Sequence, residues 1–315
     1  MGSGASATFG LPTMNDLAIE ICNHRDNFSD DEEICEFFTN IKQGIGLETA
    51  LGIDSQMSQT DKDLIRKIVW DTINSADRRF FNNLLQCQSK DLSLVSLLKK
   101  LLEPTPHIID IITTNYDRLV EYASDIAKAN IITGYEGTYF KTMEPPCSKF
   151  YAKTMRARIR TVNLWKVHGS LDWFLDPYGE LCSLPVVENI PEHFSPCIVP
   201  PGHDKYQITH FNPYRFTMAQ ADKAIQKAKS YLVFGYGFND DHIQPKILEE
   251  IKKNKPIVVV TKNATTSCKN LIQQTSNTKY MIIEEQDKKT HVITDNSDDL
   301  YDEQFWTMQD FIDKW

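Results

Sequence analysis

Three short polar clusters follow directly after apolar runs, and their residue types could do chemistry on a nucleotide sugar. Asn115 and Asp117 follow the run HIIDIIT, and His168 follows TVNLWKV. A third cluster, GYGFND, begins at Gly235 after SYLVF. An imidazole can accept a proton near neutral pH, and an amide can hold a ribose hydroxyl or orient a water molecule. We therefore take Asn115, Asp117 and His168 as the candidate catalytic residues.

Asp117 and His168 also have purely structural interpretations. Asp117 could cap a helix that begins at Arg118, and a single histidine is more often structural than catalytic. Gly169 favours the functional interpretation of His168, because a sharp turn there would expose the imidazole. The run Asp240, Asp241 and His242 is typical of helix capping rather than of a metal site.

Elements along the chain predict the architecture that would bring these clusters together. Short strands rich in β-branched residues are expected at 107–113, 161–167, 230–234 and 256–261, with helices between them. A helical zone covers 30–102, and the proline-rich stretch 174–213 is expected to be irregular and to pack over the crevice. This alternation predicts a Rossmann-like, doubly wound parallel sheet with a helical insertion module. Ligands of such sheets bind beyond the carboxyl ends of the strands, where all three polar clusters would lie.

The division into parts follows from the same pattern. We expect a single domain over 1–315, with a nucleotide-binding core at 1–29 and 104–290. The helical insertion is expected at 30–103 and a C-terminal helical tail at 291–315.

Composition excludes several classes of protein. The 315 residues carry a formal net charge of −9, and 41% are hydrophobic, as in an ordinary globular protein. Nucleic-acid binding is not expected, since it requires clustered basic residues, and the one basic run, 153–160, is local. The seven cysteines form no CxxC pair, which argues for reduced thiols and against a four-cysteine zinc site. No apolar run reaches 18 residues and no signal pattern opens the chain, so we expect a cytoplasmic protein without membrane spans.

The amino-terminal sequence GSGAS, followed by GLPT, is typical of a loop that approaches a pyrophosphate. A flexible terminus is the alternative. A strand normally leads into such a loop, and only Met1 stands before Gly2. Either that strand lies outside this sequence or another segment fills its place in the sheet.

Taken in order, the motifs resemble the sirtuin superfamily. GSGAS with GLPT is similar to the family's NAD loop, TTNYD to its Thr-Gln-Asn-Ile-Asp motif and KVHGS to its catalytic histidine segment. FGYG and VVVTKN resemble the segments beside the adenosine half. Thr114 and Tyr116 depart from the family pattern. The resemblance implies NAD as substrate and the following binding residues: Gly2, Ser3, Gly4, Ala5, Ser6, Pro12, Thr13, Thr114, Gly235, Gly237 and Asn263.

Other departures indicate which relatives to expect. The chain lacks the four-cysteine zinc module of deacylating sirtuins, so no zinc is expected, and its helical zone differs from theirs. It resembles instead the sirtuin-like proteins of bacterial anti-phage systems, which hydrolyse NAD to ADP-ribose and nicotinamide. That resemblance implies an NAD glycohydrolase that forms homo-oligomers, with a co-encoded HerA-type ATPase as a possible partner. A protein deacylase or ADP-ribosyl transferase, and a non-catalytic NAD or ADP-ribose scaffold, remain as alternatives.

Overall fold

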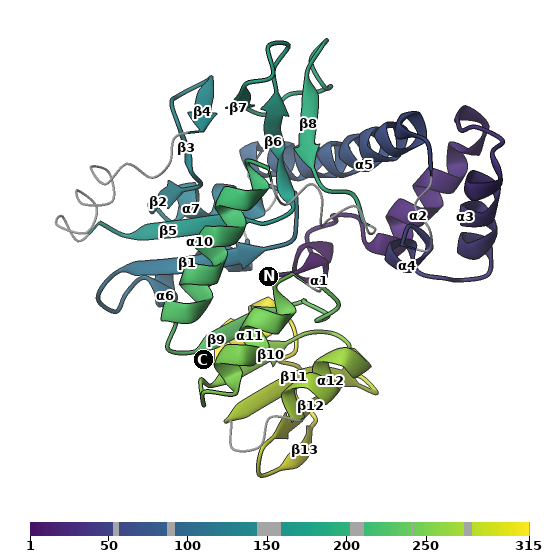
Figure 1. Cartoon of the computed structure of the whole chain (residues 1–315). Coiled ribbons are helices and arrows are strands. Elements are labelled where there is room, and N and C mark those ends of the chain that lie inside the picture. The colour runs from purple at the N-terminus through teal and green to yellow at the C-terminus, as the bar shows by residue number, and fades with distance from the viewer. Residues whose placement is uncertain are drawn as a thin grey trace.

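Parallel strands and flanking helices form the centre of the molecule in a computed structural model (Figure 1). The structure describes residues 1–52, 57–86, 92–143, 159–201, 211–240, 242–273 and 279–314. One sheet has the order β1 (Ile108–Thr113), β5 (Thr161–Lys166) and β2 (Asn130–Ile132), all parallel. In a second sheet, β9 (Tyr231–Phe234), β10 (Ile257–Val260) and β11 (Tyr280–Gln286) run parallel. These strands confirm the predicted α/β class.

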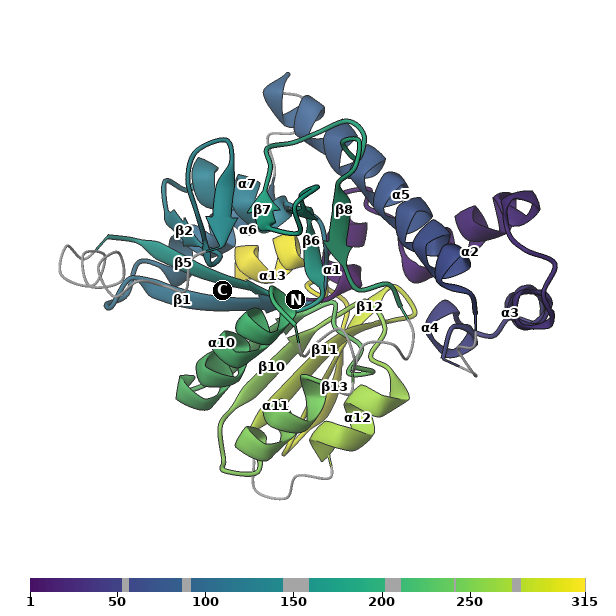
Figure 2. The same cartoon turned by 45° about the horizontal axis from the view of Figure 1, so that its top comes forward.

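Helices cover both faces of these sheets, as a doubly wound arrangement requires. On one face lie α10 (Tyr214–Lys227), α11 (Gln244–Ile251) and α12 (Thr266–Gln273); on the other lie α6 (Ser93–Leu101) and α13 (Met308–Lys314) (Figures 1 and 2). The helix α7 (Leu119–Ile126) connects β1 to β2. The residues of β5 (TVNLWK) and most of those of β10 (IVVV) are buried between these layers.

The helices between residues 14 and 85 form a lobe beside the sheets. They are α2 (Met14–Asn23), the 3₁₀ turn at Arg25–Asn27, α3 (Glu32–Lys42), α4 (Leu47–Ala50) and α5 (Gln59–Leu85). The long helix α5 is tied to the core by buried polar contacts. Asp77 accepts hydrogen bonds from the backbone N–H (2.8 Å) and Nε (2.9 Å) of Arg118. Because both residues are buried, this ion pair fixes α5 against the start of α7.

A third sheet takes two of its strands, β7 (Leu181–Ser183) and β8 (Ser195–Ile198), from the stretch 174–213 that was expected to be irregular. Its antiparallel strands are β3 (Tyr135–Glu136), β4 (Lys141–Met143), β7, β6 (Gly169–Leu175) and β8. Most of these strands are only two to four residues long, too short for an alternating pattern to stand out. Pro196 is accommodated because β8 is an edge strand.

The C-terminal segment 291–315 also differs from the expected helical tail. The strands β12 (Lys289–Thr294) and β13 (Asp298–Tyr301) extend the second sheet, and only α13 is helical. Asp287 and Lys288 both have positive φ, which is the geometry of a two-residue hairpin turn. The turn lacks the glycine that normally marks such hairpins in a sequence.

Met1 and Gly2 lie between the two parallel sheets. The Met1 amino group donates to the Ile112 carbonyl of β1 (2.7 Å), and the Gly2 N–H donates to the Phe234 carbonyl of β9 (3.0 Å). Among the described residues, β1 and β9 belong to separate sheets, and only these contacts of Met1 and Gly2 link the two strands through backbone hydrogen bonds. Within the described ranges, no helix is both long and apolar enough to span a membrane.

Candidate active site

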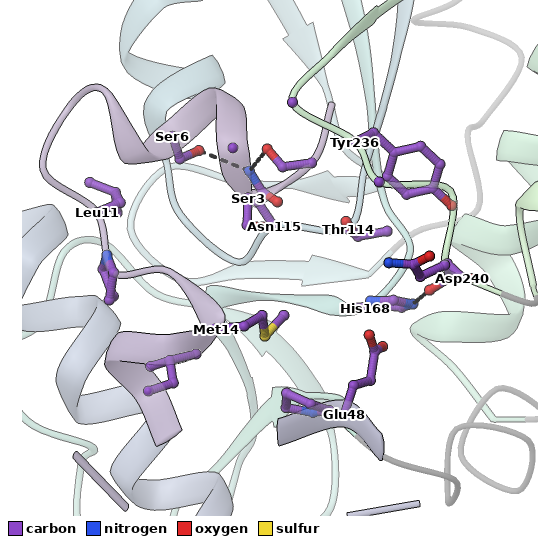
Figure 3. Close-up of a pocket in the computed structure, with 18 of the residues that line it drawn as sticks. Ser3, Ser6, Leu11, Met14, Glu48, Thr114, Asn115, His168, Tyr236 and Asp240 are labelled. Atoms are coloured by element: carbon purple, nitrogen blue, oxygen red, sulfur yellow. Dashed lines mark hydrogen bonds and ion pairs between the residues drawn. The ribbon is translucent and has the colours of Figure 1, made fainter. Parts of the chain in front are cut away.

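A cleft of about 400 Å³ opens at the carboxyl ends of β1, β5, β9 and β10 (Figure 3). The short helix α1 (Ser3–Ala7) forms one wall. The cleft gathers all three predicted catalytic residues, Asn115, Asp117 and His168. It also gathers most of the predicted binding residues: Gly2, Ser3, Gly4, Ser6, Pro12, Thr114, Gly235, Gly237 and Asn263.

Two predicted binding residues lie away from the cleft surface. Ala5 is buried in the hydrophobic core. Thr13 caps α2: its side chain accepts from the Asp16 N–H, while Asp16 accepts from the Thr13 backbone in a capping box. The structure does not describe two histidines of the proline-rich stretch, His203 and His210, or two of the seven cysteines, Cys87 and Cys147.

Asn115 ties the strand end of β1 to α1. Its Nδ2 donates to the Gly2 carbonyl (2.9 Å) and to Ser6 Oγ (2.8 Å), and Ser6 Oγ in turn donates to Asp117 Oδ2 (2.7 Å). Both protons of the amide are therefore used within the protein. The Asn115 Oδ1 atom remains as the group that can accept a hydrogen bond from a ligand, since no described residue donates to it.

Asp117 has a structural role in addition to its place in the cleft wall. Its Oδ1 accepts the Leu119 N–H (3.2 Å) at the start of α7, although the N-cap residue of that helix is Arg118 rather than Asp117 as predicted, and its Oδ2 accepts from Ser6. Burial raises the pKa of Asp117, which the nearby Lys166 and the Ser6 hydrogen bond oppose. Asp117 thus holds α1 and α7 together beside Asn115.

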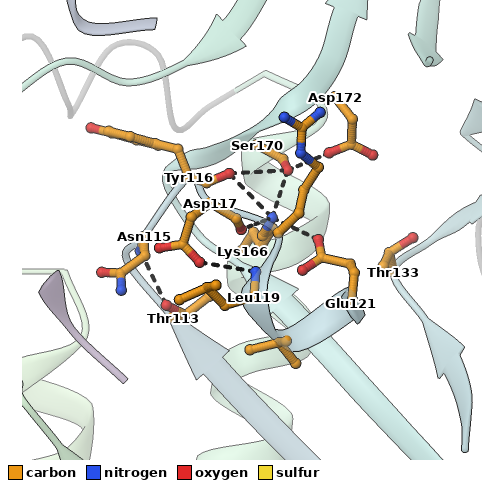
Figure 4. Close-up of polar contacts among 12 residues, drawn as sticks. Thr113, Asn115, Tyr116, Asp117, Leu119, Glu121, Thr133, Lys166, Ser170 and Asp172 are labelled. Carbon is orange, nitrogen blue, oxygen red and sulfur yellow. Dashed lines mark hydrogen bonds and ion pairs between the residues drawn. The ribbon is translucent and has the colours of Figure 1, made fainter. Parts of the chain in front are cut away.

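Lys166 lies directly beneath this turn, at the end of β5 (Figure 4). Its buried ammonium group donates to the carbonyl oxygens of Asp117 (2.5 Å) and Tyr116 (3.2 Å) and to Ser170 Oγ (2.7 Å). It also forms an ion pair with Glu121 (2.6 Å). These contacts satisfy turn carbonyls that face away from the cleft, so Lys166 fixes the orientation of Asn115 and Asp117.

Glu121 should make stability depend on pH. Burial raises the pKa of this carboxyl to about 7, although Lys166 opposes the shift, and Glu121 Oε2 has no hydrogen-bond partner in the described chain. A folded pKa above the unfolded one gives stabilisation that is complete below about pH 4.5 and is lost as pH rises through about 7. Relative to Glu121→Gln, the wild-type chain should therefore lose on the order of 2–3 kcal/mol of unfolding free energy between pH 5 and pH 8. Denaturant unfolding of both proteins at the two pH values measures this loss, and a difference that does not vary with pH would contradict it.

His168 stands at the end of β5 and pairs with Asp240. Its Nε2 lies 2.9 Å from Asp240 Oδ2, close enough for an ion pair but outside hydrogen-bond alignment. The backbone carbonyl of His168 accepts from Val199 (2.8 Å). The side chain is buried in the cleft wall rather than exposed, contrary to the expectation from Gly169. Gly169 instead has a φ of 90° and lies against Cys197, whose carbonyl oxygen would be 2.0 Å from an added Cβ.

Asp240 also fulfils the capping role predicted for its cluster. Its Oδ1 accepts the N–H groups of His242 (2.9 Å) and Ile243 (3.3 Å) at the start of α11. The second role of Asp240, its pairing with His168, was not predicted. One oxygen of the carboxylate accepts the N–H groups before α11, while the other lies beside the imidazole. The position of Asp240, just beyond a strand end, was the only signal of that second role.

The glycines of the amino-terminal segment serve close packing rather than direct donation to a ligand. The N–H groups of Gly2 and Gly4 donate to Phe234 and Gly235 carbonyls (3.0 and 3.1 Å) and are not available for a pyrophosphate. Gly235 has a φ of 55°, and a Cβ there would lie 2.1 Å from the Ala5 nitrogen. Only glycine allows α1 to approach the end of β9 this closely.

Gly235→Ala should therefore displace α1 and weaken the cleft. We expect a loss of about 2–4 kcal/mol of unfolding free energy from strain and backbone collision. Gly179→Ala is the matched control: Gly179 also has positive φ (81°), but nothing lies within 4 Å of its Cβ position. It isolates the conformational cost, about 1 kcal/mol. Equal losses for the two variants, measured by denaturant unfolding, would show that the packing of α1 on Gly235 is unimportant.

Several residues that line the cleft had no signal in the sequence. Glu48 of α4 projects into the cleft near His168, and Met14 of α2 lies nearby (Figure 3). Leu17 of α2 also lines the cleft. Tyr236, Lys262 and Thr265 line the end formed by β9 and β10. Glu48 comes from a helix distant in sequence from the motifs, so only tertiary structure brings it there, whereas Met14 and Leu17 lie in the helix that follows GLPT. Among the described residues, no group of three or more His, Cys, Asp or Glu side chains could hold a metal ion.

The fold and this cleft agree with a known family. The family model of the SIR2-like domain matches residues 110–291, more than half of the chain, and the chain belongs to that family. Proteins of this kind use NAD as a substrate, and the matched range includes Asn115, Asp117, His168 and Asp240. The glycine-containing segment at Gly2 lies outside the matched range.

Solved structures give more distant resemblances. A structure from work on the mechanism and regulation of Sir2 enzymes shares 15% identity, with a TM-score of 0.43 over 86% of this chain and 82% of the other. A structure from work on sirtuin substrate affinity shares 15%, with a TM-score of 0.42 over 84% and 82%. Sir2 bound to acetylated peptide shares 13%, with a TM-score of 0.39 over 87% of both chains. No curated protein matches the chain.

Proposed function

We propose that this protein is an NAD glycohydrolase that converts NAD and water to ADP-ribose, nicotinamide and a proton. The observation that carries the proposal is the convergence of Asn115, His168 and Asp240 in one cleft, which Gly237 and Asn263 also line. The cleft volume of about 400 Å³ lies in the usual range of small-molecule sites.

The nicotinamide ribose would lie beside Asn115 and His168. The bond between ribose C1′ and the nicotinamide nitrogen breaks, and its electron pair leaves with nicotinamide, which becomes neutral. The ribose is left with oxocarbenium character, which fixed dipoles and nearby carboxylates stabilise. Glu48 and Asp240 provide negative charge at this end of the cleft.

Water then attacks C1′, and a base must accept its proton. Asn115 Oδ1 would orient the water or a ribose hydroxyl. His168 would accept the proton, with Asp240 beside its Nε2 favouring the charged imidazolium that forms. Asp117 was expected to contact the nicotinamide amide. With both oxygens bonded within the protein, it would act by holding Ser6 and Asn115 in place.

Asp240→Asn should reveal the contribution of this pair. The variant keeps a side-chain oxygen for the α11 cap but removes the negative charge beside His168. We expect kcat for NAD cleavage to fall by about 10- to 100-fold with little change in KM, because the lost charge favours the imidazolium only after proton transfer. Asp222→Asn on α10 is the control. A kcat within twofold of wild type would exclude Asp240 from the proton transfer.

The rival functions use the same cleft but different acceptors. A deacylase would need an acyl-lysine peptide, and a transferase would need a protein side chain as acceptor. Incubation with NAD, with and without an acetyl-lysine peptide, separates them. We expect equal rates of nicotinamide release and free ADP-ribose in both mixtures. Nicotinamide release that requires the peptide would establish the deacylase, and NAD binding without products would support a scaffold.

The biological setting that we propose is NAD depletion in the cytoplasm during anti-phage defence. The resemblance of the ordered motifs to those of sirtuin-like defence proteins supports it. We also propose a homo-oligomer that works with a HerA-type ATPase. Cleavage assays with and without that ATPase test whether the partner activates the enzyme.

We further propose that the whole chain acts as one domain. In this organisation the helices between 30 and 103 are an insertion that contributes Glu48 to the cleft of the nucleotide-binding core.

A further inference from the structure

The turn that follows β10 lines the cleft beside the glycine turn that follows β9. These two strands are parallel neighbours joined through α11, so they form a βαβ unit. Thr261, Lys262 and Asn263 at the end of β10 line the cleft. Gly237, in the turn after β9, lines it too, and its carbonyl accepts from Thr265 Oγ1 (2.5 Å). This hydrogen bond holds the two turns together.

The residue types in the β10 turn bear on which dinucleotide the cleft accepts. In a dinucleotide-binding βαβ unit, a carboxylate beyond the second strand accepts from the 2′-hydroxyl of the adenosine ribose and favours NAD. A cation there accommodates the 2′-phosphate of NADP instead. The segment Thr261–Thr265 supplies the ammonium group of Lys262 and the amide of Asn263, but no carboxylate.

The carboxylates at the end of the neighbouring strand, β11, are bonded elsewhere. Glu284 Oε2 accepts the Ala264 N–H (2.9 Å), and its Oε1 pairs with Lys269 (2.5 Å). Glu285 Oε1 accepts the Lys288 N–H (3.1 Å) in the hairpin turn. Neither glutamate is among the described residues that line the cleft, so neither replaces the missing carboxylate.

The carboxylates that do line the cleft have roles at its other strands. Asp117 is bonded to α1 and α7, and Asp240 lies 2.9 Å from His168. Glu48 projects into the cleft near the same histidine (Figure 3). Lys262 is exposed, and among the residues that the structure describes no carboxylate forms an ion pair with it. Its ammonium group can therefore pair with an anionic ligand.

We propose that the cleft also accepts NADP, with the Lys262 ammonium group paired to the 2′-phosphate of the adenosine ribose. This inference rests on the proposed function. With the nicotinamide ribose beside His168 at the end of β5, the adenosine half extends past β1 and β9 to β10. Asn263 would donate to the same phosphate or to the ribose 3′-hydroxyl. The reaction with water is unchanged, and NADP would give 2′-phospho-ADP-ribose, nicotinamide and a proton.

Isothermal titration with ADP-ribose and with 2′-phospho-ADP-ribose tests the proposal without any bond cleavage. Three proteins are compared: the wild type, Lys262→Glu and Lys252→Glu. The two substitutions change the net charge equally. Lys252 is the matched control, because it is exposed at the end of α11 remote from Asp240 and is not among the residues that line the cleft.

We expect the wild-type protein to bind 2′-phospho-ADP-ribose at least as tightly as ADP-ribose. Lys262→Glu should weaken binding of the phosphorylated ligand by at least about tenfold relative to ADP-ribose, the usual effect of losing a hydrogen bond to a charged group. Lys252→Glu should keep the wild-type ratio of affinities.

Two results would overturn the proposal while leaving the NAD site in place. One is a wild-type protein that binds 2′-phospho-ADP-ribose more weakly than ADP-ribose, and the other is a ratio of affinities that Lys262→Glu does not change. Binding of neither ligand would overturn the proposed function as well, because the cleft would then not hold the adenosine half of the dinucleotide.

Discussion

His168→Ala should lower the rate of NAD cleavage by about 10²- to 10⁴-fold, the usual contribution of general acid–base catalysis. The imidazole lies in the cleft wall with Asp240 2.9 Å from its Nε2, and no other described histidine lines the cleft. In the proposed mechanism it accepts the proton released when water attacks the ribose. The measurement is the initial rate of nicotinamide release at saturating NAD.

The fold of His168→Ala should remain intact, although some stability will be lost with the buried ring. Denaturant unfolding with an unchanged m-value, the slope of unfolding free energy against denaturant concentration, would show that the variant still unfolds cooperatively. His24→Ala is the matched control, because that imidazole is half-exposed and pairs only with Glu20 and Asn27 among the described residues. Wild-type turnover by His168→Ala would remove this histidine from the mechanism.

Asn115→Ala should lower kcat by about 10²- to 10³-fold, the cost typical of removing one preorganised polar group from an active site. Two effects combine in this variant. Loss of Oδ1 removes the group that orients water or a ribose hydroxyl, and loss of Nδ2 frees α1 from the end of β1. Initial rates over a range of NAD concentrations separate an effect on kcat from an effect on KM.

A second substitution distinguishes these two effects. Ser6→Ala removes the hydroxyl that links Asn115 to Asp117 but leaves the Asn115 side chain in the cleft. If Asn115 acts on the substrate, Asn115→Ala should be impaired far more than Ser6→Ala. Similar losses in the two variants would mean that Asn115 acts only by holding α1.

The parallel core could be predicted from the sequence because its signals are local. The isoleucine run of β1 and the valine run of β10 predict short buried strands, and each ends at a polar cluster. In the structure β10 is mostly buried, whereas most residues of β1 are only partly buried. Because ligands bind at the carboxyl ends of parallel strands, these strand ends alone predict that Asn115 and His168 lie close together. The cleft contains both residues.

What could not be predicted depends on contacts between distant segments. Glu48 reaches the cleft because α4 packs beside α2, and nothing in the local sequence LETA indicates that position. The glycine pattern predicts that the amides of Gly2 and Gly4 face a ligand, whereas the structure uses them on β9. The glycines of this amino-terminal segment are needed because α1 lies very close to Gly235. Such close packing requires the same small residues as a phosphate-binding loop.

The most direct measurement is the product balance when the purified protein is incubated with NAD alone, with His168→Ala alongside. The mechanism predicts one ADP-ribose and one nicotinamide for each NAD consumed, without any acylated peptide, and a rate at least about 10²-fold lower for the variant. If nicotinamide appears without free ADP-ribose, the ribose has been transferred to another acceptor and water is not the nucleophile. Equal rates for both proteins would contradict the assignment of the cleft as the site of NAD cleavage.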